Sequence, residues 1–218
     1  MFAIVAGPLP VPAGTSPEDF EKGHAARNPT VVAKEPGCMV YQLTKTKKGE
    51  YYILELYKDK EALDLHFNNM GSKNGAPPPE KLKPDGMLKI LPVVSAIVKE
   101  GSASIANVVK LPMKDGALFE EVVTPAMVEM DRNEPDTATY ILAKSPDGNT
   151  YFFVELFKDQ AAIDFHSKAD AFKVMNKKMV PAIKGAPGGK PDFSLMGMAV
   201  CGGNVPRKMC AAMIPSKM

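Results

Sequence analysis

Two of the three histidines in this chain of 218 residues, His66 and His166, lie 100 positions apart in segments that resemble each other. An imidazole titrates near neutral pH, so either ring could remove a proton from a phenolic or quinol hydroxyl, whose anion then gives an electron to oxygen. The alternative is an interior histidine that a neighbouring acceptor satisfies, because His66 shares a helical face with apolar side chains. The sequence leaves both interpretations open.

Glu55 and Glu155 stand in otherwise apolar segments that alternate like strands. A carboxylate on the aromatic face of such a strand is costly to bury alone, so it either lines a wet cavity or takes part in a buried hydrogen-bonded pair. Both glutamates are therefore candidate catalytic residues. The face they occupy also carries Tyr51, Ile53 and Tyr57 in the first segment and Tyr151, Phe153 and Phe157 in the second.

Four tyrosines are candidate substrate-binding residues. Tyr41 and Tyr140 could donate hydrogen bonds to an oxyanion, and Tyr51 and Tyr151 share the strand face of the two glutamates. The alternative is that these rings only pack in a core.

Metal binding is not predicted, because each segment offers one of these histidines and no paired ligands at helical or strand spacing. Haem held by a single histidine remains an alternative. His24 has no counterpart in the second segment, and we expect it on a helix surface. The three cysteines form no Cys-x-x-Cys pair, so no disulfide framework is indicated and Cys38 is expected to be structural.

The chain reads as a tandem duplication. Residues 35–43 match residues 134–142 at an offset of 99, and residues 51–59 match 151–159 at an offset of 100. Gly75-Ala76-Pro77 returns as Gly185-Ala186-Pro187 at an offset of 110, so the second copy carries about ten extra residues before this loop. Self-similarity of this length indicates two domains rather than a solenoid. We assign residues 1–101 to copy one, 102–205 to copy two and 206–218 to a tail.

Each copy is expected to run β-α-β-β-α-β, the ferredoxin-like order. Ser16-Pro17-Glu18-Asp19 predicts the start of the first helix of copy one, whereas Thr124-Pro125 interrupts the corresponding segment of copy two. Asp59 and Asp159 are expected to cap the second helix of each copy. The expected outer strands cover residues 2–6, 104–111, 87–98 and 193–201.

Such a unit covers one face of its antiparallel sheet with helices and leaves the other face bare. A second, identical sheet would cover it. The sequence therefore predicts an α+β protein in which two ferredoxin-like units pack sheet to sheet within one chain, with an internal pseudo-twofold axis.

The repeated strings, Glu35-Pro36-Gly37-Cys38 with Tyr41, then Glu55, and Lys58-Asp59 with Ala62, Leu63, Asp64 and His66, resemble the antibiotic biosynthesis monooxygenase (ABM) family. The resemblance implies a dimeric α/β barrel, here fused into one chain. The family includes cofactor-independent quinol or polyketide monooxygenases, haem-degrading enzymes and a sugar-phosphate isomerase. Of its helix pattern His-x-x-Ser-x-His-Phe, copy two keeps His166 and Phe172 but has Ala171, and copy one has Gly71.

The resemblance implies a small-molecule enzyme, a monooxygenase without a cofactor that acts on a quinol or phenolic substrate in the space between helices and sheet. Non-catalytic ligand binding or a stress-response role, and haem binding or degradation, are the alternatives. If one copy has lost its function, we expect copy two to retain it, because it keeps more of the helix pattern. The expected ligand is a small apolar or aromatic molecule.

The overall charge argues against other partners. A formal net charge of +2 does not provide the positive field that nucleic acid requires, and no apolar stretch approaches the roughly 20 residues of a membrane span. We expect a cytoplasmic protein. Peroxisome or glycosome is the alternative, because Ser216-Lys217-Met218 is close to a Ser-Lys-Leu import signal.

Overall fold

The computed structural model describes residues 1–83, 86–99 and 101–203. The expected import signal at residues 216–218 lies outside the described residues. Copy one comprises β1 (Phe2–Leu9), α1 (Pro17–Lys34), β2 (Cys38–Lys45), β3 (Tyr51–Tyr57), α2 (Lys60–Asn69), the short 3-10 helix η1 (Pro79–Lys81) and β4 (Leu88–Val98). Copy two comprises β5 (Ile105–Pro112), α3 (Gly116–Asn133), β6 (Thr137–Lys144), β7 (Thr150–Phe157), α4 (Gln160–Lys168), α5 (Asp170–Ile183) and β8 (Asp192–Gly203).

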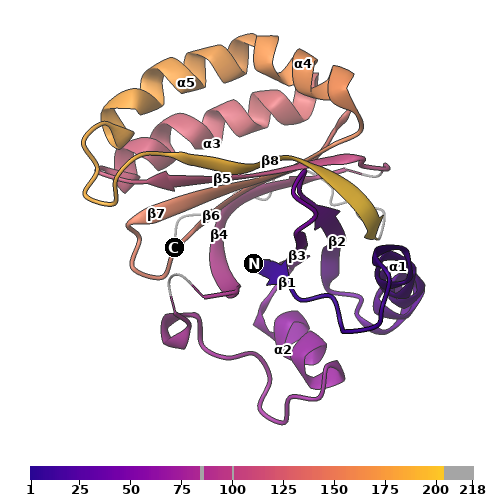
Figure 1. Ribbon diagram of the computed structural model, residues 1–218. Helices are drawn as coiled ribbons and strands as arrows, with labels where there is room; N and C mark the ends of the chain where they lie inside the picture. Colours follow the sequence, from indigo (N-terminus) through magenta and orange to yellow (C-terminus); the bar gives the residue numbers. More distant parts are fainter. Residues whose placement is uncertain (84–85, 100, 204–218) are drawn as a thin grey trace.

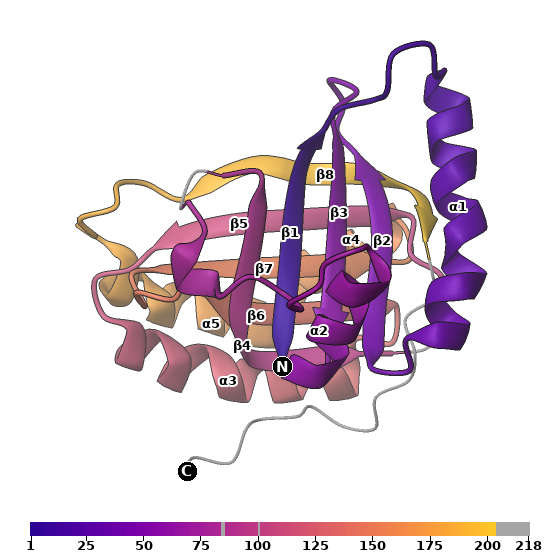
Figure 2. The ribbon, with the colours of Figure 1, turned by 90° about the horizontal axis from the view of Figure 1, so that it is seen from below.

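The strands close into one antiparallel barrel in the order β1-β3-β2-β8-β5-β7-β6-β4. Each copy contributes four neighbouring strands, and the copies join where β2 meets β8 and where β4 meets β6. The helices cover the outside, with α3, α4 and α5 over the sheet of copy two and α1 and α2 over that of copy one (Figures 1 and 2). The predicted α+β architecture of two ferredoxin-like units is confirmed.

The last strand of each copy, β4 or β8, is long because it pairs with strands of both copies. β4 pairs with β1 of its own copy through Leu88 to Pro92 and with β6 of the other copy through Val93 to Val98. β8 likewise pairs first with β5 and then with β2. Pro92, which cannot donate to a strand ladder, lies where β4 leaves one partner and joins the other, a position that tolerates a missing donor.

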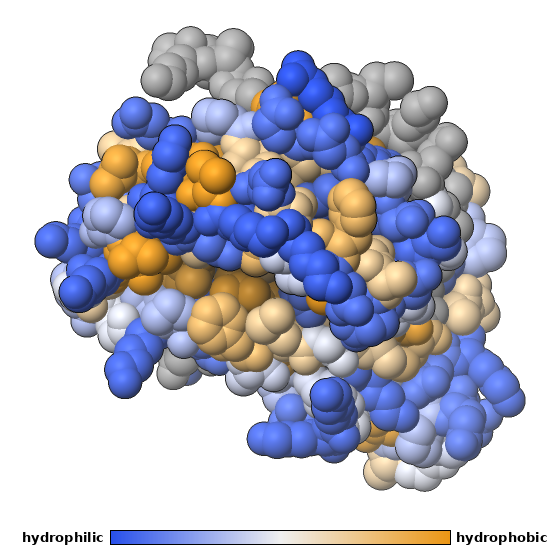
Figure 3. Space-filling view, turned by 90° about the horizontal axis from the view of Figure 1, so that it is seen from above, coloured by the Kyte–Doolittle hydropathy of each residue, from blue (hydrophilic) through white to orange (hydrophobic). Residues whose placement is uncertain are grey.

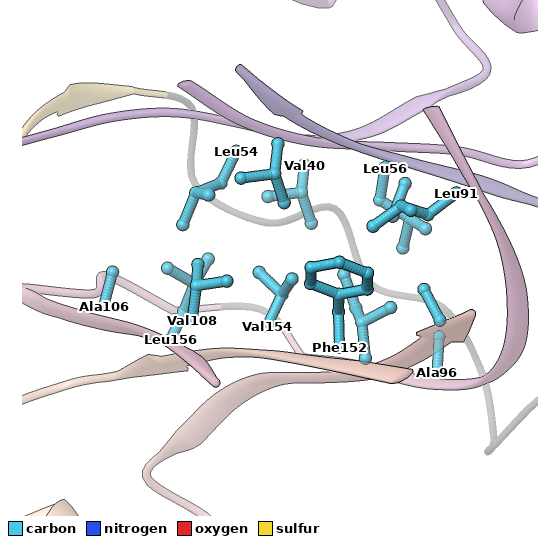
Figure 4. Close-up of a cluster of buried hydrophobic side chains, with 14 of the residues drawn as sticks. Val40, Leu54, Leu56, Leu91, Ala96, Ala106, Val108, Phe152, Val154 and Leu156 are labelled. Atoms are coloured by element: carbon cyan, nitrogen blue, oxygen red, sulfur yellow. The ribbon is translucent and has the colours of Figure 1, made fainter. Parts of the chain in front are cut away.

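The barrel interior is a packed apolar core rather than a channel. Leu54, Leu56, Val154 and Leu156 are each at most 2% exposed, and side chains from the two copies point toward one another across the interior (Figure 4). Burying one such leucine contributes roughly 2 kcal/mol. The alternate positions of the same strands face the helices, which places Glu55 and Glu155 outside the barrel core.

The predicted helix starts are confirmed. The Ser16 hydroxyl accepts the Asp19 N–H at 3.1 Å, and the carboxylates of Asp59 and Asp159 accept the N–H groups of Ala62 and Ala162 at 2.8 and 3.0 Å.

The expected interruption at Thr124-Pro125 is wrong, because α3 continues through Pro125. A proline inside a helix costs about 3 kcal/mol. The helix buries Phe119, Val123 and Met127 completely against the sheet, and this tertiary burial outweighs the lost hydrogen bond.

Helix α5 is the main difference between the copies. It occupies the region where copy two has about ten extra residues, and it packs against α3 (Figure 1). In copy one the described residues between α2 and β4 form only η1. Among the described residues, no helix has both the length and the apolar character needed to cross a membrane.

Candidate active site

Each of the two equivalent histidines is held by a glutamate from the end of the preceding long helix. His166 Nδ1 lies 2.7 Å from Glu134 Oε2, and His66 Nδ1 lies 2.8 Å from Glu35 Oε2. Each glutamate is the C-terminal cap residue of its helix, where the helix dipole disfavours a negative charge. A histidine that donates to the carboxylate, and can carry a positive charge, compensates for this.

Glu35 and Glu134 were not predicted as site residues. Their signal in the sequence is that both copies keep a Glu-Pro pair at the same place in the repeat. That pattern fixes their equivalence, but only the folded chain brings the C-terminal ends of α1 and α3 beside α2 and α4.

In copy two a cavity of ≈ 440 Å³ lies between the sheet and helices α4 and α5. Its walls are largely apolar and include Leu111, Phe153, Met179 and Ile183. Lys184, which ends α5 and is exposed, also belongs to the lining. The volume is in the range of small-molecule sites.

Four buried polar side chains line this cavity, those of Asn107, Tyr140, Glu155 and His166, each at most 6% exposed. Ser167 and Asn176 also belong to the lining. Asn107 is fixed at both ends of its amide: its Oδ1 accepts the Gly197 N–H at 2.8 Å, so its Nδ2 donates to Glu155 Oε2 at 3.0 Å. The strand register places Asn107 directly opposite Glu155.

Two buried atoms of the cavity residues have no hydrogen-bond partner within the described parts of the chain, His166 Nε2 and Tyr140 Oη. Because the Nδ1–H of a neutral His166 donates to Glu134, Nε2 carries the lone pair. The imidazole packs among the rings of Phe157 and Phe172, with centroids 5.3 and 4.3 Å away. This arrangement leaves a basic nitrogen in an apolar wall.

Burial changes the acidity of the neighbouring groups. It raises the pKa of Glu155, and a charged His166, the Asn107 amide and the neighbouring Tyr140 hydroxyl only partly offset this. Burial also raises the pKa of the Tyr140 hydroxyl far above its usual value, and the negative charges of Glu155 and Glu134 add to the effect. Tyr140 is therefore a hydrogen-bond donor at neutral pH and not an acid.

In copy one, side-chain donors that copy two lacks satisfy the two glutamates. Tyr57 Oη donates to Glu55 Oε2 at 2.8 Å, and this oxygen lies 3.8 Å from His66 Nε2. Asn69 Nδ2 donates to Glu35 Oε1 at 3.0 Å. Copy one thus places two carboxylates beside its histidine, that of Glu35 within hydrogen-bond distance and that of Glu55 beyond it.

Tyr41, the counterpart of Tyr140, is 4% exposed, and its ring centroid lies 6.1 Å from that of His66. The Tyr51 hydroxyl donates to Glu21 at 2.6 Å and that of Tyr151 donates to Glu120 at 2.6 Å. These last two bonds connect the first helix of each copy to its sheet, and the fold gives both tyrosines a structural partner outside the histidine networks.

The expected surface position of His24 is wrong. Its side chain is only 9% exposed and packs on Phe20 with ring centroids 4.8 Å apart. Burial lowers its pKa. Cys38 is buried, and its thiol donates to the Val40 carbonyl at 3.4 Å. In the described ranges no group of three His, Cys, Asp or Glu side chains could hold a metal ion.

The solved structures most relevant to the fold span almost the whole chain. A candidate monooxygenase from Lactobacillus acidophilus NCFM is 18% identical, with a TM-score of 0.66 over 94% of this chain and 97% of its own. A second, from Fusobacterium nucleatum subsp. nucleatum, is 18% identical, with a TM-score of 0.64 over 95% and 97%. A monooxygenase-like protein from Listeria innocua is 11% identical, with a TM-score of 0.51 over 92% and 93%. At these identities the likeness shows the fold.

No curated protein sequence matches the chain. The family model for antibiotic biosynthesis monooxygenase matches twice, over residues 3–76 and 104–178, which together make up more than half of the chain. The two matches coincide with the two copies of the repeat. The chain therefore belongs to the antibiotic biosynthesis monooxygenase family, with two copies of its domain in tandem.

Proposed function

We propose that copy two is a cofactor-independent monooxygenase site for a small apolar or aromatic molecule that carries a phenolic or quinol hydroxyl, with His166 as the base. One observation carries the proposal: His166 belongs to the wall of the cavity, its Nδ1 is held by Glu134, and its buried Nε2 has no partner among the described residues. A base needs a free lone pair and a fixed tautomer, and this geometry supplies both.

In the proposed reaction, Nε2 removes the hydroxyl proton, and Glu134 stabilises the imidazolium that forms. The substrate anion transfers an electron to O₂, and recombination forms a carbon–oxygen bond. Loss of water from the resulting peroxide leaves one oxygen atom in the product. All four electrons that reduce O₂ come from the substrate, so the step requires neither metal nor flavin.

The other polar groups suit the charge that develops. Tyr140, whose hydroxyl stays protonated, can donate a hydrogen bond to the substrate oxyanion. Burial raises the pKa of Glu155 and so favours the protonated form of this carboxyl, the form that can donate. Asn107 holds Glu155 in place. Lys184 at the exposed end of α5 favours a substrate whose outer end is anionic.

Oxygen uptake tests the proposal. With a 1,4-naphthohydroquinone in chelator-treated buffer, we expect consumption of O₂ above the rate of autoxidation. His166→Ala should lower that rate at least about a hundredfold, and His66→Ala, the matched change in copy one, should leave it within about twofold. Equal losses in the two variants would contradict the assignment to copy two.

The alternative is a binding protein that uses the same cavity without catalysis. It predicts thermal stabilisation by the quinol without oxygen uptake. His166 Nε2 is also the atom that could ligate a haem iron, so a haem titration is the companion measurement. A Soret band that His166→Ala removes would favour the haem alternative over the monooxygenase.

A further inference from the structure

A second hollow lies on the outer surface of copy two, between α3 and the junction of α4 with α5. This outer groove has a volume of ≈ 720 Å³ and is lined by Glu121, Val122, Pro125, Ala126, Glu129, Asn133, Glu134, Phe165, Ala169, Asp170, Ala171, Val174, Met175 and Lys178. Figure 3 shows the molecule from above the helices of copy two, where hydrophobic side chains are exposed among hydrophilic ones. Phe165 and Val174 are 54% and 51% exposed.

Glu134 belongs to the lining of the groove, and one of its oxygens is unsatisfied. Its Oε2 accepts from His166 and from the Thr137 hydroxyl at 2.9 Å, but the buried Oε1 has no hydrogen-bond partner among the residues that the structure describes. Glu134 is 1% exposed. A carboxylate oxygen that is desolvated without a donor costs free energy, so its persistence calls for a donor from elsewhere.

Copy one has the side-chain donor that copy two lacks. There the equivalent oxygen, Glu35 Oε1, accepts from Asn69. The position 100 residues later is Ala169, which has no donor and instead lines the groove. Copy two therefore lacks the amide donor, and both Glu134 and the alanine that replaces the donor belong to the lining of the groove.

The groove has the electrostatic character of a cation site. Four carboxylates line it, those of Glu121, Glu129, Glu134 and Asp170, and the lining includes one ammonium, that of Lys178. Arg132 and Lys173, outside the lining, pair with Glu129 and Asp170. Its remaining lining is mostly apolar. An apolar body with a terminal ammonium would match both properties, since a charged donor forms the stronger hydrogen bond to a carboxylate.

We propose that the outer groove of copy two is a binding site for a small hydrophobic amine, whose ammonium supplies the donor that Glu134 Oε1 lacks. The groove and the inner cavity share one wall residue, Met175, and Glu134 contacts His166 directly. Occupancy of the groove is thus positioned to regulate the histidine, because a cation beside Glu134 opposes formation of the imidazolium. The binding itself does not depend on the proposed oxygenase activity.

Calorimetric titration with 2-phenylethylamine and its neutral counterpart 2-phenylethanol tests the site. We expect the amine to bind at least tenfold more tightly than the alcohol. Glu134→Gln should weaken amine binding at least tenfold, and the matched Glu35→Gln in copy one should change it less than twofold. Equal affinity for amine and alcohol, or equal losses in the two variants, would overturn the proposal.

A second variant guards against a folding defect in Glu134→Gln. Ala169→Asn restores the residue that copy one has and stands at the N-cap of α5, a position that favours asparagine. We expect it to fold at least as stably as the wild type and to lose tenfold in amine affinity, because the amide fills the groove and satisfies Oε1. Unchanged amine binding in the folded Ala169→Asn variant would count against the site.

Discussion

The two copies share one fold and one glutamate–histidine pair but differ in what surrounds it. In copy one, Tyr57 donates to Glu55 and Asn69 donates to Glu35, and both carboxylates lie beside His66. In copy two the same positions are Phe157 and Ala169, and unsatisfied atoms of His166, Tyr140 and Glu134 accompany two hollows. The contrast shows that a duplicated domain can keep a polar network as a structural element in one half and open it toward a ligand in the other.

The strand glutamate has a different hydrogen-bond donor in each copy, and the position of each donor holds an apolar residue in the other copy. Glu55 faces Ile4 across the sheet and is bonded by Tyr57, whereas Glu155 faces Asn107 and has Phe157 in place of the tyrosine. Each carboxylate keeps one donor, but from a different direction. In copy two the donor comes from the neighbouring strand.

The largest effect is expected where the copies do not differ. Leu56→Ala and Leu156→Ala each remove a fully buried side chain from the shared barrel core, and each should cost about 3 kcal/mol of unfolding free energy. Urea denaturation should show one cooperative transition in both variants, because the core belongs to both copies. A variant in which one copy unfolds before the other would show that the copies are independent.

This exchange of donors predicts that a second substitution can compensate for the loss of the Asn107 donor. Asn107→Ile removes the donor of Glu155 and the acceptor of the Gly197 N–H, at a cost of about 2 kcal/mol. Adding Phe157→Tyr reproduces the arrangement of copy one and should recover about 1 kcal/mol. A double-mutant cycle by urea denaturation measures the coupling, and strictly additive effects would contradict the comparison.

The buried glutamates predict a pH dependence of stability. Burial raises the folded-state pKa of Glu55 and of Glu155 above the ordinary value of 4.5. Each therefore adds stability that is complete below pH 4.5 and is lost as the pH rises through the folded pKa. Glu55→Gln and Glu155→Gln should each flatten the fall in melting temperature above pH 4.5.

The exposed Glu129 is the control for this measurement, and Glu129→Gln should leave the pH profile unchanged. His166 and Glu134 also face Glu155, so the profile is best recorded in the His166→Ala background as well. A wild-type melting temperature that is constant from pH 4.5 to pH 8 would show that neither glutamate pKa is raised.

The smallest effect concerns the mouth of the cavity. Lys184→Gln should weaken binding of an anionic aromatic ligand by about threefold, because a single exposed charge contributes less than 1 kcal/mol. Lys177→Gln, also on α5 but outside the cavity lining, should have no effect. Loss of the difference at 1 M salt would confirm that the contribution is electrostatic.

Much of the fold could be predicted because it depends on local signals and on repetition. The capping residues Ser16, Asp59 and Asp159 mark helix starts, and the alternation along the strand places Glu55 on the face of Tyr51 and Tyr57. The sequence signals failed where tertiary burial outweighs local preference, as at Pro125 inside α3 and at the buried His24.

The candidate site was predicted only in part. His66, His166, Glu55 and Glu155 stand out as polar residues in apolar repeats, whereas Glu35 and Glu134 do not, because a glutamate at the end of a helix is usually solvated. The separation of two residues along the sequence does not tell whether the end of one helix lies beside a histidine on another.

The amino-acid sequence alone determined that this protein is two copies of one α+β unit and that each copy carries one conspicuous histidine and one strand glutamate. Only the tertiary structure decided that the buried Nε2 of His166 lies at a cavity and has no hydrogen-bond partner among the described residues. The physical reason is that periodicity and capping act over a few residues, whereas the donors that close or open a buried carboxylate come from distant strands and helices. Their presence depends on how those elements pack.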